Sequence, residues 1–332
     1  MKKILAIALL LCMMLVMGAW SASGEEYTLG MGVVVSTDSS KTNNAQVDAT
    51  VAAVVLDKDG KIAACRIDCA QSKMDVTDGE VDAEKEFLSK VELKEDYNMV
   101  KFSDATLEWY QQAANFEEFC VGKTADEVLA AETTLNDEGH TVFVDETLYA
   151  SVSISVSDMQ QAVAKACADD QAVTFTANGE VTFGLACNTE ATESVAATDD
   201  ADGVVKMYTD FAAAVVDADG KVVANLQDAI QPQIVIDVDG EIGDITFRGT
   251  KRELKEDYNM VKFSDATLEW YQQAANFEAF ANGKTAEELA GVETVVNEEG
   301  HQVFADETLY ASVSISVDGM TSVLLKAIDY AR

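Results

Sequence analysis

One segment of this chain occurs twice, letter for letter. ELKEDYNMVKFSDATLEWYQQAANFE occupies residues 92–117 and returns at residues 253–278, an offset of 253 − 92 = 161 residues. Flanking stretches also match, such as GKTADEV from residue 122 and GKTAEEL from residue 283. Solenoid repeats are shorter than this. We therefore interpret the chain as a tandem duplication of a domain of about 150 residues, a common domain size.

Composition limits the function classes that need to be considered. The chain has 332 residues, of which 48% are hydrophobic, and it carries 59 acidic against 23 basic residues for a net charge of −36. The apolar content supports globular domains rather than disorder. A charge of this sign repels phosphates and anionic lipid head groups, so nucleic acid and membrane surfaces are poor candidates for direct partners.

The N-terminus is typical of an exported protein. Lys2 and Lys3 precede an apolar run at residues 4–16, and the small residues of GAWSAS follow before Gly24. This pattern predicts a secretory signal peptide at residues 1–23. The alternative, a membrane anchor, needs about 20 apolar residues. We expect repeat domain 1 at 24–170 and repeat domain 2 at 171–332, without a membrane span, in the cell envelope or outside the cell.

The cysteines do not form a complete disulfide framework. The expected mature chain keeps an odd number, so at least one thiol is free or intermolecular. Cys65 and Cys69 fall in one predicted strand, too far apart to bridge. With only two histidines in the chain, a Cys/His zinc site has little support. The five cysteines are Cys65, Cys69, Cys120, Cys167 and Cys187, and the first four correspond to Asn225, Ala229, Ala281 and Ile328 in the second repeat.

Each repeat contains a predicted β-hairpin. Residues 51–56 and 61–69 are apolar and rich in β-formers, and DKDG lies between them; the second repeat has DADG from residue 217. An Asp-Gly turn fits a hairpin. The Asp-x-Asp-Gly pattern also begins calcium-binding loops of the EF-hand type, but such a loop would need further oxygen ligands later in the sequence. We therefore interpret both segments as turns. We also interpret the acidic stretch at 237–241 as a turn.

Helices are predicted after each hairpin. Ser103 and Asp104 are candidate caps for a helix in which Trp109, Ala113, Phe116 and Cys120 recur at helical spacing. Such a stripe is typical of a core, although exposed aromatics could form a platform for a sugar or flavin. Capping boxes begin at Thr124 and Thr285.

The end of each repeat reads as a strand followed by a helix. Apolar and polar residues alternate over 148–156 and 309–317, which predicts half-buried strands. Ser157-Asp158 and Asp318 are the expected caps of the helices that follow. The whole pattern predicts an α+β fold made twice, with a β-hairpin and antiparallel sheet and helices packed on one face.

These segments together resemble secreted FMN-binding-domain repeat proteins of anaerobic Firmicutes. That domain is distantly similar to flavinylated subunits of Rnf-type and sodium-pumping NADH:quinone oxidoreductase complexes, which carry FMN on a threonine in the motif D-x-x-S-G-A-T. The matching stretches here are DETLYAS at 145–151 and at 306–312. The resemblance implies that the cofactor-binding residues are Asp145, Ala150, Ser151, Asp306, Ala311 and Ser312.

The motif is degenerate in both repeats. Leu148-Tyr149 and Leu309-Tyr310 replace Ser-Gly, so the glycine that permits a tight turn is missing. Two interpretations follow. The first is a secreted or cell-envelope binding protein, non-catalytic and without cofactor, built from two degenerate FMN-binding-like domains and contacting a protein, glycan or redox partner at the cell surface. The alternative is an extracellular electron-transfer protein that carries FMN on one or both repeats.

Overall fold

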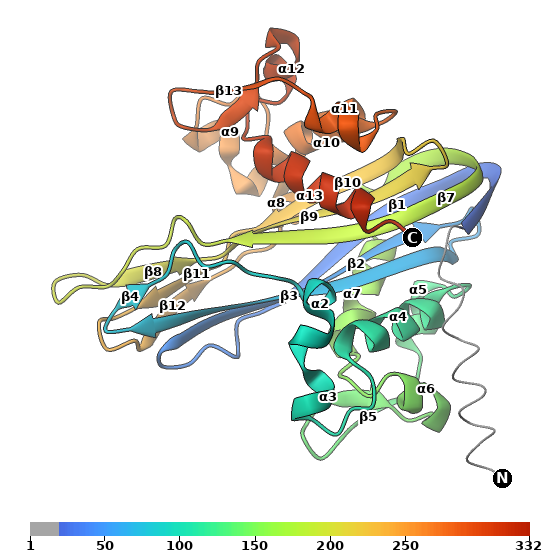
Figure 1. Cartoon of the computed structure of the whole chain (residues 1–332), viewed down its shortest axis with the longest axis horizontal. Coiled ribbons are helices and arrows are strands. Elements are labelled where there is room, and N and C mark those ends of the chain that lie inside the picture. The colour runs from blue at the N-terminus through green and yellow to red at the C-terminus, as the bar shows by residue number, and fades with distance from the viewer. Residues whose placement is uncertain (1–19) are drawn as a thin grey trace.

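One antiparallel sheet runs through both repeats. The computed structural model describes residues 20–332, and it is a mixed α+β structure, as predicted (Figure 1). The strands of the large sheet lie in the order β10-β9-β7-β1-β2-β3-β4. Their bounds are β1 (Trp20–Ser36), β2 (Asn44–Leu56), β3 (Ile62–Thr77), β4 (Glu80–Val81), β7 (Val173–Glu190), β9 (Tyr208–Asp217) and β10 (Val222–Ile230).

Two long strands join the halves of this sheet. The first part of β1 pairs with the first part of β7, from Trp20 opposite Val181 to Leu29 opposite Val173. The second part of β1 pairs with β2, and that of β7 pairs with β9. Of the expected signal peptide, residues 1–19 lie outside the described residues and residues 20–23 begin β1. The expected boundary at 170/171 falls in the connection to β7.

The predicted hairpins and turns are confirmed. In the turn between β2 and β3, Asp57 Oδ1 accepts hydrogen bonds from the main-chain N–H groups of Asp59 and Lys61, both at 2.9 Å. Gly60 has a φ of +74°, which favours glycine. Residues 237–241 also form a turn. It joins β11 (Gln233–Ile236) to β12 (Ile242–Thr246), which with β8 (Gly203–Lys206) form a second sheet.

The helices follow the same order in both repeats. Repeat 1 has α2 (Lys90–Leu93), η2 (Lys94–Tyr97), α3 (Met99–Phe102), α4 (Trp109–Cys120), α5 (Ala125–Leu129), the strands β5 (Thr133–Leu135) and β6 (Thr141–Phe143), α6 (Glu146–Ser151) and α7 (Ser157–Cys167). Repeat 2 has α8 (Lys251–Leu254), η3 (Lys255–Tyr258), α9 (Met260–Phe263), α10 (Trp270–Ala281), α11 (Ala286–Ala290), β13 (Thr294–Val296), β14 (Gln302–Phe304), α12 (Glu307–Ser312) and α13 (Asp318–Asp329).

Several of the predicted caps are wrong, although the helices exist. The capping boxes at Thr124 and Thr285 are confirmed, and the aromatic stripe of α4 is buried. The N-cap of α4 is Glu108, whereas Ser103 ends α3. Val156 and Val317 precede α7 and α13, so Ser157 and Asp318 are the first helical residues. An aspartate in a first turn stabilises the helix through its dipole without capping it.

The sheet folds so that its two halves face each other. Alternate residues of β2 separate two cores: Val51 and Ala53 face the strands of repeat 2, while Ala52 and Val54 face α4 and α7. A third core lies between the strands of repeat 2 and its own helices. Each set of helices therefore covers one outer face, with the strands between them, as Figure 1 shows.

Glycines let the last helix of each repeat approach its sheet closely. A Cβ atom at Gly30 would lie 2.1 Å from the main-chain oxygen of Ala166 on α7. A Cβ atom at Gly184 would lie 1.9 Å from that of Ala327 on α13. Neither distance is compatible with a side chain, so these strand glycines are required by packing.

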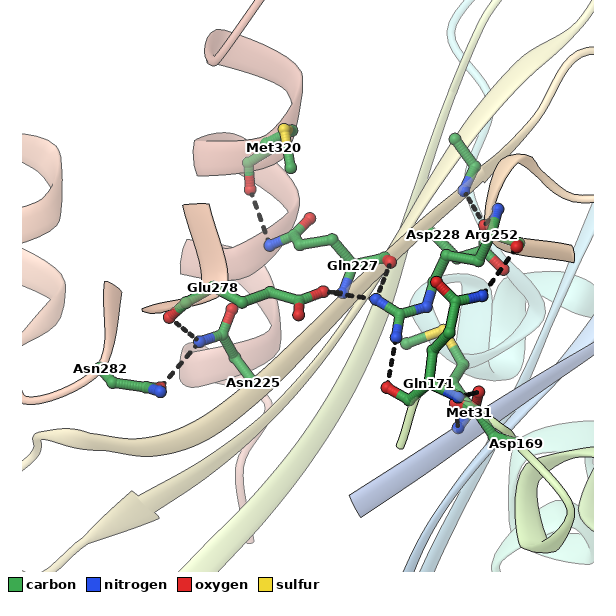
Figure 2. A network of polar contacts seen from close by, with 11 residues as sticks. Met31, Asp169, Gln171, Asn225, Gln227, Asp228, Arg252, Glu278, Asn282 and Met320 are labelled. Atoms are coloured by element: carbon green, nitrogen blue, oxygen red, sulfur yellow. Dashed lines mark hydrogen bonds and ion pairs between the residues drawn. The ribbon is translucent and has the colours of Figure 1, made fainter. Parts of the chain in front are cut away.

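A buried ion pair in repeat 2 holds the connection between the repeats (Figure 2). Arg252 Nη1 lies 2.8 Å from Glu278 Oε1, and both side chains are buried. Arg252 Nη2 donates to the main-chain oxygen of Gln171 at 2.6 Å, and the Gln171 side chain donates back to the Arg252 oxygen at 2.7 Å. The residues that follow α7 are thus bound to the core of repeat 2.

Repeat 1 makes the reciprocal contact. Arg66 Nη2 donates to the main-chain oxygen of Arg332 at 2.6 Å, and Glu117 Oε2 accepts from the Arg332 guanidinium at 2.9 Å. Arg66 Nε also donates across the central core to the Phe183 oxygen at 2.9 Å. Arg252 of repeat 2 therefore holds the connection between the repeats, and Arg66 and Glu117 of repeat 1 hold the last residue of the chain.

A second pair of contacts crosses between the repeats, one of them partly exposed and the other largely buried. Lys165 of α7 lies 2.5 Å from Glu253 of α8, and Lys326 of α13 lies 2.7 Å from Glu92 of α2. Lys165 Nζ also donates to the main-chain oxygen of Val33 at 2.7 Å, and Lys326 Nζ donates to that of Cys187 at 3.0 Å. Each terminal helix is thereby tied to its own first strand and to the other repeat.

We expect Arg252→Ala to destabilise the whole chain by about 3–5 kcal/mol, because it leaves the carboxyl group of Glu278 buried without its partner. Urea denaturation followed by circular dichroism measures this loss. Arg248→Ala removes an exposed arginine of the same segment and should change the free energy of unfolding by less than about 0.5 kcal/mol. Equal effects of the two substitutions would contradict the role given to the buried pair.

The free energy of unfolding should fall as the pH rises from about 4 to about 7. Burial raises the pKa of Asp68 and Asp228 to about 6 and that of Glu278 to about 7. The same groups titrate near 4 in an unfolded chain. The folded state therefore binds more protons in this window, and stability decreases with pH.

Asp228→Asn tests this dependence with little change in geometry. Asp228 Oδ1 accepts hydrogen bonds from the N–H groups of Ala229 and Arg252, at 2.8 and 3.1 Å, and an amide oxygen can accept both. Urea titrations across this pH range should give a slope shallower by up to about 1.4 kcal/mol per pH unit. Asp219→Asn, in an exposed turn, should leave the slope unchanged. If the free energy of unfolding depends on pH equally in Asp228→Asn and in the parent chain, the raised pKa of Asp228 is contradicted.

Candidate functional site

The residues implied by the flavin resemblance lie at opposite ends of a short helix in each repeat. Asp145 is the N-cap of α6, where its Oδ1 accepts hydrogen bonds from the N–H groups of Thr147 at 2.9 Å and Leu148 at 3.0 Å. Asp306 caps α12 in the same way. Each aspartate therefore holds the start of its helix.

The serine hydroxyls are used within these helices. Ser151 Oγ donates to the main-chain oxygen of Leu148 at 2.9 Å, and Ser312 Oγ donates to that of Leu309 at 2.9 Å. Ala150 and Ala311 are exposed. A six-residue helix rises about 9 Å, so the serine and the capping aspartate do not converge on one point.

The strands predicted at residues 148–156 and 309–317 are wrong. Capping by Asp145 turns the first part of the segment into α6. The remainder is irregular, with a bend at Ile154, and it buries Val152, Ile154 and Val156 without a partner strand. Gln112 of α4 replaces that strand, because its Oε1 accepts from the N–H groups of Ser153 and Ile154.

An open groove lies beside Asp145, between the end of α4, α5 and the start of α6. Its volume is about 580 Å³. Five apolar residues and four charged residues line it: Phe119, Ala130, Ala131, Val144 and Leu148, with Lys123, Glu127, Glu132 and Asp145. The sequence gives little sign of this groove, because its residues come from three elements and share no period.

The groove carries an acidic rim around an apolar surface. Its one cation is already engaged, since Lys123 Nζ lies 4.2 Å from the centre of the Phe119 ring and donates to the Phe119 main-chain oxygen. The hydrogen bond from the Thr124 N–H group lowers the pKa of Glu127 below its usual value, so this carboxylate is charged at neutral pH. Glu132 forms no ion pair with any residue in 20–332.

Repeat 2 has the same aromatic, lysine and acidic residues at the corresponding place, although Gly291, Val292 and Ala305 replace Ala130, Ala131 and Val144. Lys284 Nζ lies 4.0 Å from the centre of the Phe280 ring, and Phe280 packs against Phe304 at 5.0 Å. Glu288, Glu293, Asp306 and Leu309 correspond to the remaining charged residues and to Leu148. The chain thus presents this combination of aromatic ring, engaged lysine and carboxylates twice.

A lysine enclosed by aromatic rings is a second recurring feature. Lys251 is only 5% exposed; its Nζ donates to Tyr208 Oη at 3.0 Å and lies about 5 Å from the rings of Tyr258 and Trp270, at 4.8 and 5.3 Å. Burial lowers the pKa of Lys251 to about 8. Lys90 lies over the corresponding rings of repeat 1. Each lysine packs between the aromatic rings of its own repeat. The sequence patterns did not predict this packing.

The two histidines predicted as possible proton-transfer or ligand residues lie apart from the groove residues. His140 and His301 are exposed in turns, where Asn136 and Asn297 accept from their main-chain N–H groups. Within residues 20–332, no group of three or more His, Cys, Asp or Glu side chains is placed to hold a metal ion. No helix in the same range is long and apolar enough to cross a membrane.

Comparison with known proteins adds no evidence on the fold or the groove. No family model matches the chain, and neither a characterised protein nor a solved structure does.

We expect Asp145→Ala to lower the stability of α6 by about 1 kcal/mol, the usual contribution of an N-cap. Amide hydrogen exchange of Thr147 and Leu148 measures this loss locally. Glu146→Ala, in the first turn but outside the cap, should accelerate exchange much less. Unchanged protection in Asp145→Ala would contradict the capping role.

Proposed function

We propose that this chain is an exported, non-catalytic binding protein of the cell envelope or extracellular medium, built from two degenerate FMN-binding-like domains. The observation that carries the proposal is the pair of equivalent surfaces beside Asp145 and Asp306. In repeat 1 this surface is an open groove, and repeat 2 has the corresponding residues. Two similar sites on one rigid chain favour a partner with repeated features, because the second contact is then intramolecular.

The chemistry of the groove favours a basic partner segment with an apolar side chain. Phe119, Val144 and Leu148 offer apolar contact, and Glu127, Glu132 and Asp145 surround it with negative charge. Lys123 is occupied by Phe119 and does not neutralise all of this charge. The net charge of −36 adds long-range attraction for cations. A lysine- or arginine-containing peptide of a surface protein has the matching properties.

The distribution of ionisable groups supports a binding role over catalysis. Asp68, Asp228 and Glu278, whose pKa values burial raises, lie in the core and hold the main chain through hydrogen bonds. They have no surface at which to meet a substrate. In the groove, the hydrogen bond from the Thr124 N–H group holds the pKa of Glu127 below its usual value, further from the neutral range that general acid–base chemistry needs.

The same groups disfavour a flavin in this groove. The phosphate of FMN would face three carboxylates and a lysine that is already engaged. Covalent attachment would need the hydroxyl of Ser151 or Ser312 to leave its hydrogen bond within the helix. These features support the binding protein over the electron-transfer alternative.

Calorimetric titration tests the proposal with a short synthetic peptide that alternates lysine and leucine. We expect two peptides bound per chain, and an affinity that falls with added salt because the rim is exposed. Glu132→Lys combined with Glu293→Lys places a cation in the groove of repeat 1 and at the corresponding surface of repeat 2. It should weaken binding by about tenfold or more, since like charges oppose each other across the contact.

Two controls separate the grooves from the overall charge. Glu118→Lys combined with Asp219→Lys makes the same change in net charge at exposed positions outside the groove, and it should leave the affinity nearly unchanged. An alternating glutamate and leucine peptide should not bind. Equal binding by both double variants would refute the groove as the site. A flavin absorbance spectrum that survives denaturation, with added mass at Ser151 or Ser312, would establish the electron-transfer alternative instead.

A further inference from the structure

Two thiol groups of repeat 1 lie together in the core between β3 and α4. Cys65 and Cys120 are both fully buried, in the cluster that β2 and β3 form with α4 and α7. Neither thiol takes part in the groove. All five cysteines from residue 20 onward are free in this structure.

Hydrogen bonds between β3 and α4 align these two residues. At one end, Glu117 Oε1 accepts from the N–H group of Ile67 at 2.9 Å. At the other end, the N–H group of Gly122 donates to the oxygen of Ile62 at 2.8 Å. Cys65 lies between these two β3 residues, and Cys120, the last residue of α4, lies between Glu117 and Gly122. The strand and the helix are therefore held in register on both sides of the thiols.

Two independent observations indicate that the Cys65 and Cys120 side chains are in contact. A hydrogen bond to the Cys120 thiol, together with burial, raises the pKa of Cys65 well above its usual value. In repeat 2, Asn225 occupies the place of Cys65, and its Nδ2 donates to the Glu278 main-chain oxygen at 2.9 Å. Glu278 lies in the last turns of α10, near Ala281, which corresponds to Cys120. The side chain at this strand position therefore reaches the end of the helix in both repeats.

We propose that Cys65 and Cys120 form a disulfide when the chain folds in the presence of a disulfide donor, so that β3 and α4 of repeat 1 are covalently joined. One cysteine thiolate attacks the donor and releases one thiol; the second cysteine then attacks this mixed disulfide and releases the other. The two cysteines are oxidised and the donor is reduced to two thiols. Exported proteins meet such donors as they fold.

The other cysteines have different surroundings. Cys69 lies on the same strand as Cys65, at a spacing that cannot bridge. Cys187 lies in the central core, where its Sγ is 3.7 Å from Asp68 Oδ2. Cys167, at the end of α7, packs against the same cluster as Cys120, and burial together with the charge of Cys120 raises its pKa to about 11. The hydrogen bond between the Cys65 and Cys120 thiols favours their pairing over that of Cys120 with Cys167.

Refolding of the full chain from denaturant with a mixture of oxidised and reduced glutathione tests the bond. Thiol alkylation in denaturant followed by peptide mass mapping should show two fewer alkylatable thiols than in the reduced chain, and one cross-linked pair of peptides that contains Cys65 and Cys120. The oxidised chain should unfold at a higher urea concentration, and reduction should reverse this shift.

Cys120→Ala is the matched variant, because alanine stands at this position in repeat 2 and is accommodated there. It should refold, retain the alkylatable Cys65 and show no shift in urea midpoint between oxidising and reducing conditions. Recovery of both thiols in the parent chain, a glutathione adduct in place of the cross-link, or a cross-link between any other pair would overturn the proposal.

Discussion

A buried arginine and glutamate in each repeat fix the chain where the repeats meet. Arg252, paired with Glu278, binds the main chain of Gln171 in the connection between the repeats, and Arg66 and Glu117 of repeat 1 bind Arg332 of repeat 2. Removal of these charges from water is costly, and the cost is offset only when every partner is in place. The core of repeat 1 therefore requires the end of repeat 2, and the core of repeat 2 requires the connection that follows α7. The central core, which takes residues from β1, β2, β7 and β9, depends on the same alignment.

This reciprocal arrangement explains how the chain presents two similar surfaces. The terminal helices α7 and α13 pack on glycines of β1 and β7, and one ion pair ties each helix to the opposite repeat. The helices that carry the groove of repeat 1 and the corresponding surface of repeat 2 are therefore fixed to one central layer. In our account the function lies in these outer helices, while the buried ionisable groups serve the fold.

Local patterns in the sequence predicted the parts of the fold that depend on nearby residues. Asp57 and Gly60 define a hairpin turn whatever surrounds it, and the spacing of Trp109 and Phe116 defines a buried helix face. The segment after Leu148 was missed, because a side chain of α4 supplies the hydrogen bonds that the sequence pattern assigned to a strand. The contacts of Arg66 and the groove around Phe119 join distant residues, and no local period reports them. The degenerate motif at 145–151 did mark one edge of the groove, through Asp145.

Differential scanning calorimetry of the full chain tests the central claim, that the two repeats form a single folded body. Cores that complete each other cannot melt separately, so we predict one transition whose van't Hoff enthalpy equals its calorimetric enthalpy. Two transitions, each with about half of the total enthalpy, would show that the repeats are independent domains and would contradict the reciprocal arrangement.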